Sequence, residues 1–187
     1  MPLCRKELPM LFLLILIVFI VFFDQLTKWL AVIYLKNADG VDVIPGLLRF
    51  EYTENRGMAF GMLDGHRWVF MLVSTVMIAA LLIYLWRKPP KSRFVVLSLA
   101  FIIGGGIGNM IDRTILGYVI DFIYPCAIPA LWPWIFNVAD SFVTVGAGML
   151  IGYLLFDLIR EYRMERQSGK AFDSIGVKGE KDGQNDV

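Results

Sequence analysis

Four long runs of apolar residues, separated by polar segments, dominate the chain. A helix needs about 20 apolar residues to cross the hydrocarbon core of a bilayer. We therefore expect transmembrane helices over about residues 10–35, 68–86, 94–111 and 136–159. The first run is longer than the apolar core of a signal peptide and no A-x-A cleavage site follows it, so we expect it to be retained. The pattern predicts an all-α integral membrane protein with one four-helix domain over residues 1–160.

Lysine and arginine residues indicate the orientation of these spans. The segment 87–93, RKPPKSR, joins the second and third spans and carries four basic residues and no acid. Basic residues also occur before the first span, at Arg5 and Lys6, and after the fourth, whereas Arg113 alone is basic between the third and fourth. Because basic loops remain in the cytoplasm, we expect both termini to be cytoplasmic and the first and third connections to lie outside.

A second periodicity appears in the first outer connection. Apolar and polar residues alternate through residues 48–53, LRFEYT, which is the pattern of a half-buried strand. We expect segment 41–66 to form a small extracytoplasmic β-sheet. Residues 161–187 are polar and mixed in charge, which predicts a disordered cytoplasmic tail.

The composition supports a membrane protein and argues against several classes of function. Hydrophobic residues make up 57% of the chain and charged residues 19%, with a mean hydropathy of +0.62. The net charge is only +1 and no nucleic-acid motif is present, so we expect no nucleic-acid partner. Cys4 and Cys126 lack metal-ligand spacing and His66 is the single histidine. We therefore expect no metal site, no Ser-His-Asp triad and no cofactor.

Polar residues inside the apolar runs share a depth. At a rise of about 1.5 Å per residue, Asp24, Asn109 and Asp140 lie about 21, 22 and 28 Å from the cytoplasmic ends of their spans. All three fall in the outer third of a core about 30 Å thick. An acid within a span is unfavourable and is a functional hypothesis by default, so the shared depth predicts a common site.

The polar residues of each span also share a face, since residues three and four apart are neighbours on a helix. The three sets are Asp24, Thr27 and Lys28; Asn109, Asp112 and Arg113; and Asn137, Asp140, Ser141 and Thr144. Asp24 can pair with Lys28, and Asn109 can hydrogen-bond with Arg113. The glycines in 104–108 allow close approach of a second helix or of a ligand.

Asp121 lies beyond the third span, in a connection whose residues 119–123 are otherwise apolar. Apolar neighbours disfavour the charged form of a carboxyl group and raise its pKa. If Asp121 and Asp140 converge near the outer interface, their repulsion leaves one of them protonated. One carboxyl group can then accept a proton from water while the other donates a proton to an amide, as in aspartic proteases.

The residues alone leave other interpretations open. Asp24 with Lys28 favours a structural ion pair over a catalytic role. Lys28 and Arg113 could bind lipid phosphates, and Asn109 and Asn137 could join helices by hydrogen bonds. Acids within spans also form proton relays, so a small proton-coupled transporter is the main alternative. A lipid-binding subunit without enzymatic activity is a third possibility.

Five short stretches resemble, in order, the bacterial lipoprotein signal peptidases, also called signal peptidase II. They are DQLTK (24–28), NRGMAFG (55–61), GGGIGNMIDR (104–113), VIDF (119–122) and FNVADS (136–141). Each stretch alone is a weak signal, but five in order with four spans and a cytoplasmic N-terminus are specific. The resemblance covers about residues 10–160.

The resemblance implies an aspartic endopeptidase of the inner membrane with its active site near the outer leaflet. Its substrate would be a prolipoprotein with a diacylglyceryl group on the lipobox cysteine, cleaved just before that cysteine. Asp121 and Asp140 would be the catalytic pair. Residues implied in substrate binding or site support are Asp24, Lys28, Asn55, Gly57, Asn109, Asp112, Arg113 and Asn137. The resemblance also implies that segment 41–66 cradles the substrate and that a short outer helix lies in 122–135. We expect a monomer surrounded by membrane lipid.

Overall fold

The computed structural model describes residues 4–57, 67–127 and 134–182. Within these ranges the chain forms four helices and three strands. The helices are α1 (Cys4–Leu35), α2 (Arg67–Arg87), α3 (Arg93–Ile115) and α4 (Val138–Asp182), and the strands are β1 (Val41–Ile44), β2 (Leu48–Asn55) and β3 (Val119–Tyr124).

The lengths of these helices suit a multi-pass membrane protein. Among the described residues, three apolar helical stretches are long enough to cross a membrane, namely Met10–Leu35, Arg93–Ile115 and Val138–Arg166. Helix α2 contributes a shorter apolar stretch, Met71–Arg87. Four apolar helices with a small antiparallel sheet confirm the fold class that the sequence predicts.

Helix α1 buries one narrow stripe and leaves most of its other apolar side chains exposed. The stripe consists of Leu13, Ile17, Ile20, Asp24, Lys28, Ala31 and Leu35. These residues recur every three or four positions, which places them on one face of a helix, and α1 packs against α3. Asp24 and Lys28 therefore lie on the same protein-facing stripe as the apolar contacts. Exposed residues such as Phe19 and Phe22 are free to contact lipid.

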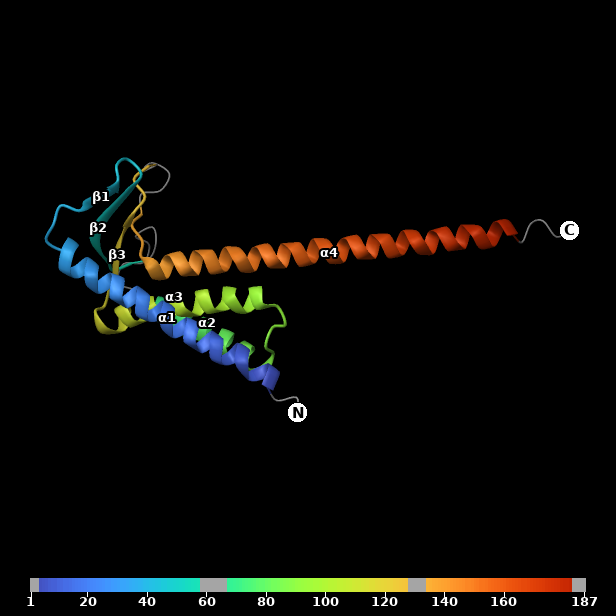
Figure 1. Cartoon of the computed structure of the whole chain (residues 1–187), viewed down its shortest axis with the longest axis horizontal. Coiled ribbons are helices and arrows are strands. Elements are labelled where there is room, and N and C mark those ends of the chain that lie inside the picture. The colour runs from blue at the N-terminus through green and yellow to red at the C-terminus, as the bar shows by residue number, and fades with distance from the viewer. Residues whose placement is uncertain (1–3, 58–66, 128–133, 183–187) are drawn as a thin grey trace. The chain divides into compact units, whose positions relative to one another are not determined.

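The three strands form one antiparallel sheet in the order β1-β2-β3. It lies at one end of helices α1 and α3 (Figure 1). A small core joins the sheet to the end of α1, where Ala31 and Leu35 contact Ile120 and Phe122, and Phe50 meets Phe122 edge-on. The sheet is thereby fixed to the helices.

The structure places Asp121 in strand β3, whereas the sequence predicts only a connection there. Helix α3 ends in a turn at Gly117, whose φ of 84° is left-handed and whose N–H donates to the Asp112 carbonyl at 3.2 Å. Glycine commonly ends helices in this way, and the chain then pairs with β2. Thr53 lies opposite Asp121 in this pairing, and a strand depends on such a partner, which local sequence does not reveal.

The short outer helix predicted in 122–135 is not found in the described part of that segment. Residues up to Tyr124 belong to β3, and Phe136 pairs with Ile123 in an isolated bridge. Residues 128–133 lie outside the described residues. The prediction of a short helix is therefore tested only at the two ends of that segment, where the chain pairs with the sheet.

Small residues let α4 approach α3 closely. A Cβ atom at Gly105 would collide with the carbonyl oxygen of Ala139, and one at Gly146 would lie 2.7 Å from the carbonyl oxygen of Ser98. Phe101 and Phe142 stack edge-on between these contacts, with ring centroids 5.0 Å apart. This is the close approach of helices that the glycine run predicts.

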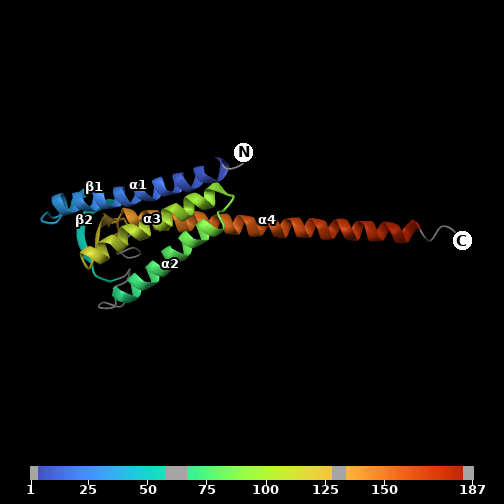
Figure 2. The same ribbon diagram turned by 90° about the horizontal axis from the view of Figure 1, so that it is seen from below.

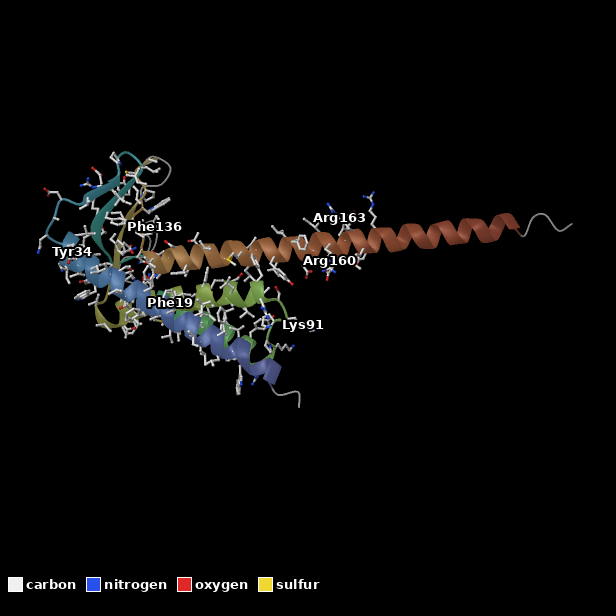
Figure 3. All side chains as sticks on the ribbon, viewed as in Figure 1. Phe19, Tyr34, Lys91, Phe136, Arg160 and Arg163 are labelled. Carbon is white, nitrogen blue, oxygen red and sulfur yellow. The ribbon has the colours of Figure 1, made fainter. Side chains whose placement is uncertain are left out.

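The basic segment 87–93, which joins α2 to α3, lies at the end of the helices opposite the sheet. The N-terminal end of α1 and the turn between α2 and α3 lie at that end (Figure 2). Lys91 is in this turn, whereas Tyr34 of α1 lies beside the sheet (Figure 3).

Residues 150–187 form a compact unit separate from residues 1–149. The sequence predicts disorder over 161–187, but α4 continues as a helix to Asp182, and 183–187 lie outside the described residues. The segment REYRMERQ, 160–167, contains mostly good helix formers, which favours this continuation.

Candidate active site

Asn137 and Asp140 fix the start of helix α4. Asn137 precedes the first helical residue, and its side-chain oxygen accepts the Asp140 N–H at 2.9 Å. In return, the Asp140 carboxylate accepts the Asn137 N–H at 3.3 Å. This reciprocal cap satisfies two N–H groups that a helix start would otherwise leave unpaired. It also holds the Asp140 carboxylate next to the Asn137 side chain.

The same Asn137 reaches Asp121. Phe136 pairs with Ile123 of β3 through two hydrogen bonds, at 2.7 and 3.0 Å. This bridge places Asn137, which is fully buried, beside the strand. Its Nδ2 donates to Asp121 Oδ1 at 2.6 Å. The Asn137 carboxamide therefore donates to the Asp121 carboxylate and accepts the main-chain N–H of Asp140.

Asn55 holds the second oxygen of Asp121. Its Nδ2 donates to Asp121 Oδ2 at 2.8 Å, across the pairing of β2 with β3. The Asn55 side-chain oxygen in turn accepts the N–H of Gly57 at 3.1 Å. Residues 58–61 of the motif NRGMAFG lie outside the described residues.

Helix α3 supplies Asn109, which is 7% exposed. Its Nδ2 donates to Asp140 Oδ1 at 2.7 Å, and its oxygen accepts from Asn137 at 3.0 Å. The Asn109 oxygen also accepts from Lys28 Nζ at 2.9 Å. Asn109 thus links Asp140 to the charged residues of α1.

Lys28 lies between two buried acids. Its Nζ is 2.8 Å from Asp24 Oδ2 and 2.9 Å from Asp112 Oδ2. These three residues are at most 2% exposed. The predicted pair of Asp24 and Lys28 is therefore present, and Asp112 joins it from α3. Among the described residues, every buried side-chain nitrogen and oxygen has a hydrogen-bond partner.

Arg113 contributes a half-buried cation at the edge of this network. Its guanidinium interacts electrostatically with Asp140, Asp121 and Asp112, in that order of strength. Its Nη1 donates to the main-chain oxygen of Asn109 at 3.4 Å, so the predicted contact involves the backbone and not the Asn109 side chain. All eight residues predicted to support the site are thus in this region, together with Asp121 and Asp140.

Gln25 belongs to the network but was not singled out from the sequence. Its Nε2 donates to Asp112 Oδ1 at 2.9 Å, to the Gly108 carbonyl at 3.2 Å and to Asp24 Oδ2 at 3.3 Å. The position of Gln25, a polar residue inside an apolar span, could have identified it from the sequence. Gly108 is also required here, because a Cβ atom at that position would lie 2.5 Å from Asp24 Oδ2.

The surroundings of Asp121 alter its acidity. Burial, and then the nearby charge of Asp140, raise its pKa to about 7. The side chains of Asn55 and Asn137 act in the opposite direction by donating to its carboxylate. A carboxyl group with this pKa can hold or release a proton near neutral pH.

The arrangement suits proton transfer better than metal binding. The described residues contain no group of three His, Cys, Asp or Glu side chains placed to hold a metal ion. Instead, two acids from different elements both accept hydrogen bonds from Asn137, Asp121 from its side chain and Asp140 from its main-chain N–H, and the pKa of Asp121 lies near neutrality. Such a pair can provide an acid and a base together.

Comparison with known proteins agrees with the motifs. The profile of the family Peptidase_A8, described as Signal peptidase (SPase) II, matches residues 16–156. The lipoprotein signal peptidase of Caldanaerobacter subterraneus subsp. tengcongensis is 46% identical over 142 residues, which cover 76% of this chain and 94% of that protein. The one from Geobacillus kaustophilus is 39% identical over 73% of this chain and 88% of its own length.

Solved structures of bacterial membrane enzymes have a similar fold. A bacterial membrane enzyme solved by the in meso method at 2.3 Å resolution matches with a TM-score of 0.72 and 33% identity, over 78% of this chain and 88% of that one. A second, at 1.9 Å resolution, matches with a TM-score of 0.68 and 32% identity, over 76% and 92% of the two chains. The fold, the ordered motifs and these matches together show that the chain belongs to the signal peptidase II family of aspartic peptidases, the lipoprotein signal peptidases.

Proposed function

We propose that Asp121 and Asp140 are the catalytic pair with which this lipoprotein signal peptidase removes the signal peptide from a prolipoprotein. The observation that carries this proposal is that Asn137 donates to both carboxyl groups, from its side chain to Asp121 at 2.6 Å and from its main-chain N–H to Asp140 at 3.3 Å. An aspartic mechanism needs two carboxyl groups that share one proton, and this arrangement brings them to one place.

The roles of the two acids follow from their surroundings. Asp140 accepts two N–H groups and lies in the first turn of α4, where the helix dipole favours negative charge. Asp121 is buried and its raised pKa favours a proton. We therefore assign Asp140 as the base and Asp121 as the acid, while the shared proton belongs to the pair.

The reaction then balances with water alone. Asp140 removes a proton from water, the oxygen attacks the scissile carbonyl carbon, and Asp121 protonates the carbonyl oxygen. Asp140 then passes its proton to the amide nitrogen as the C–N bond breaks. The new carboxylic acid returns a proton to Asp121. Arg113, whose guanidinium interacts electrostatically with both acids, stabilises the negative charge that forms during these steps.

The substrate class and orientation extend the proposal. The substrate bears a diacylglyceryl group on its lipobox cysteine and is cleaved just before that cysteine. Its acyl chains keep it in the outer leaflet of the inner membrane, so the site must lie there. The position of the site at the sheet end, with Lys91 at the other end, supports cytoplasmic termini under the positive-inside rule. The enzyme acts as a monomer.

Cleavage by purified variants tests the catalytic pair. The protein is supplied in detergent with a diacylglyceryl prolipoprotein, and the shorter product is measured. Asp121→Asn and Asp140→Asn should each lower kcat by about 100-fold or more while retaining helix content. Asp157→Asn, further along α4, is the matched control and should cleave as wild type does. Cleavage at the wild-type rate by either Asp121→Asn or Asp140→Asn would refute the assignment.

A further inference from the structure

Two buried acids that do not touch the catalytic carboxyl groups hold the main chain immediately before them. Asp24 Oδ1 accepts the N–H of Ala139 at 2.8 Å, and Ala139 directly precedes Asp140. Asp112 Oδ2 accepts the N–H of Ile120 at 3.1 Å, and Ile120 directly precedes Asp121. Each of these supporting acids therefore anchors the main chain of the residue that precedes one member of the catalytic pair.

Lys28 joins the two anchors. Its Nζ lies 2.8 Å from Asp24 and 2.9 Å from Asp112. Its third contact is Asn109 Oδ1, at 2.9 Å, and Asn109 itself donates to Asp140. These three acceptors match the three N–H donors of an ammonium group. Since Lys28 is only 1% exposed, water does not compete for these contacts.

Gln25 forms a second, uncharged connection between the same acids. Its Nε2 donates to Asp112 Oδ1 at 2.9 Å and lies 3.3 Å from Asp24 Oδ2. The two acids come from α1 and α3, whereas the two backbone groups that they hold come from α4 and β3. Four elements therefore meet through one pair of carboxylates.

We propose that Lys28 is a positioning residue that sets the separation of Asp121 and Asp140 by joining their two anchors, Asp24 and Asp112. We call Asp24, Lys28 and Asp112 the Lys28 bridge. The inference rests on the proposed function, because it assigns a geometric role toward that catalytic pair. Gln25 assists the bridge by donating to the same two acids.

A role in folding alone would not require these charges. Replacing a buried ion pair by well-packed apolar residues often leaves stability unchanged or improves it. Catalysis is less tolerant, because a misplacement of about 1 Å can lower the rate by about 100-fold. The Lys28 bridge acts on the backbone next to both reacting side chains, which is where a small displacement has the largest effect.

The test separates catalytic geometry from folding. The full-length enzyme is purified in detergent as wild type, Lys28→Met and Gln25→Leu, and kcat and KM are measured for a diacylglyceryl prolipoprotein. Only monodisperse protein with the helix content of wild type is used. Lys36→Met is the matched control, because Lys36 forms a more exposed ion pair with Glu54 at 3.3 Å. Asp121→Asn is measured in parallel.

We expect Lys28→Met to lower kcat by about 100-fold, with KM within about threefold of wild type. Gln25→Leu should lower kcat by about 10-fold, since the charged connection remains. Lys36→Met should match wild type. If Lys28→Met does not fold, Gln25→Leu decides the question, because it leaves every charge in place.

Wild-type kcat in folded Lys28→Met, or in Gln25→Leu where Lys28→Met does not fold, overturns the positioning role. An equal loss of kcat in Lys36→Met also overturns it, because the effect would not be specific to the bridge. Cleavage by Asp121→Asn would instead remove the proposed function. The two failures are therefore distinguishable in one experiment.

Discussion

Replacing Asp121 by asparagine should change how the stability of the protein depends on pH. The folded protein raises the pKa of Asp121 from 3.8 to about 7, mainly through burial and secondly through the charge of Asp140. Each unit of pKa difference between the folded and unfolded states corresponds to about 1.4 kcal/mol. A difference of about 3 units gives about 4 kcal/mol as an order of magnitude.

The sign of the effect follows from the direction of the shift. A carboxyl group with a raised pKa favours the folded state fully below about pH 4, where it is protonated in both states. This contribution disappears as the pH rises through about 7, because the unfolded chain ionises Asp121 more readily. Asparagine does not titrate. Relative to Asp121→Asn, wild type should therefore lose up to about 4 kcal/mol of unfolding free energy between about pH 4 and pH 8.

Reversible unfolding in mixed micelles measures this difference. Tryptophan fluorescence and circular dichroism are followed during titration with a denaturing detergent, for wild type and Asp121→Asn, at about one-unit steps of pH. Asp140→Asn is a second variant, in which the pH dependence should shrink only in part because burial is the larger cause. A stability difference between wild type and Asp121→Asn that is constant with pH, or that reverses in direction, would refute the reasoning.

Three further predictions concern the packing and chemistry of the site. Asn137→Ala should lower the unfolding free energy by about 2 kcal/mol, because it removes a helix cap and a buried donor. The kcat of this variant should also fall. An unchanged unfolding free energy would contradict the capping role of Asn137. Gly105→Ala should destabilise the protein because its Cβ meets the Ala139 carbonyl, whereas Gly148→Ala, with nothing within 4 Å, should not; equal melting temperatures would count against this contact. A chelator of divalent metal ions should leave kcat unchanged in the cleavage assay, and loss of activity that zinc restores would contradict an aspartic mechanism.

The sequence predicts the helices well because their signal is local. An apolar run must be satisfied by its own backbone hydrogen bonds in lipid, so length and composition suffice to place it. The ends of the helices are predicted less accurately than their existence. Helix α3 continues past residue 111 to Ile115, because Asp112 and Arg113 find partners inside the protein. Helix α4 begins at Val138, where the side chain of Asn137 can cap it.

Strand β3 was missed because its signal is not local. The segment VIDF has too few residues to distinguish a strand from a connection, and its partner, β2, lies far away in the chain. The turn at Gly117 and the bridge at Phe136 complete the pairing. A strand placed by such contacts depends on the fold around it.

The residues of the site were identified because polar side chains stand out in apolar spans. Asp24, Lys28 and Asn109 were chosen by depth and helical face, and the structure brings them together. The anchoring of Ala139 and Ile120 could not be predicted, because every residue other than proline carries a main-chain N–H group. Only the arrangement of the helices and strands decides which of these N–H groups donates to a buried acid.

The reciprocal cap of Asn137 and Asp140 restricts how this enzyme can be altered. A helix turns by about 100° per residue, so removing or adding one residue between these two positions would rotate Asp140 away from its neighbours. Any redesign that keeps the activity must therefore keep the number of residues between Asn137 and Asp140. Fusion points and inserted tags belong elsewhere, such as beyond Arg166, where lengthening the polypeptide leaves the angular position of the carboxylate unchanged.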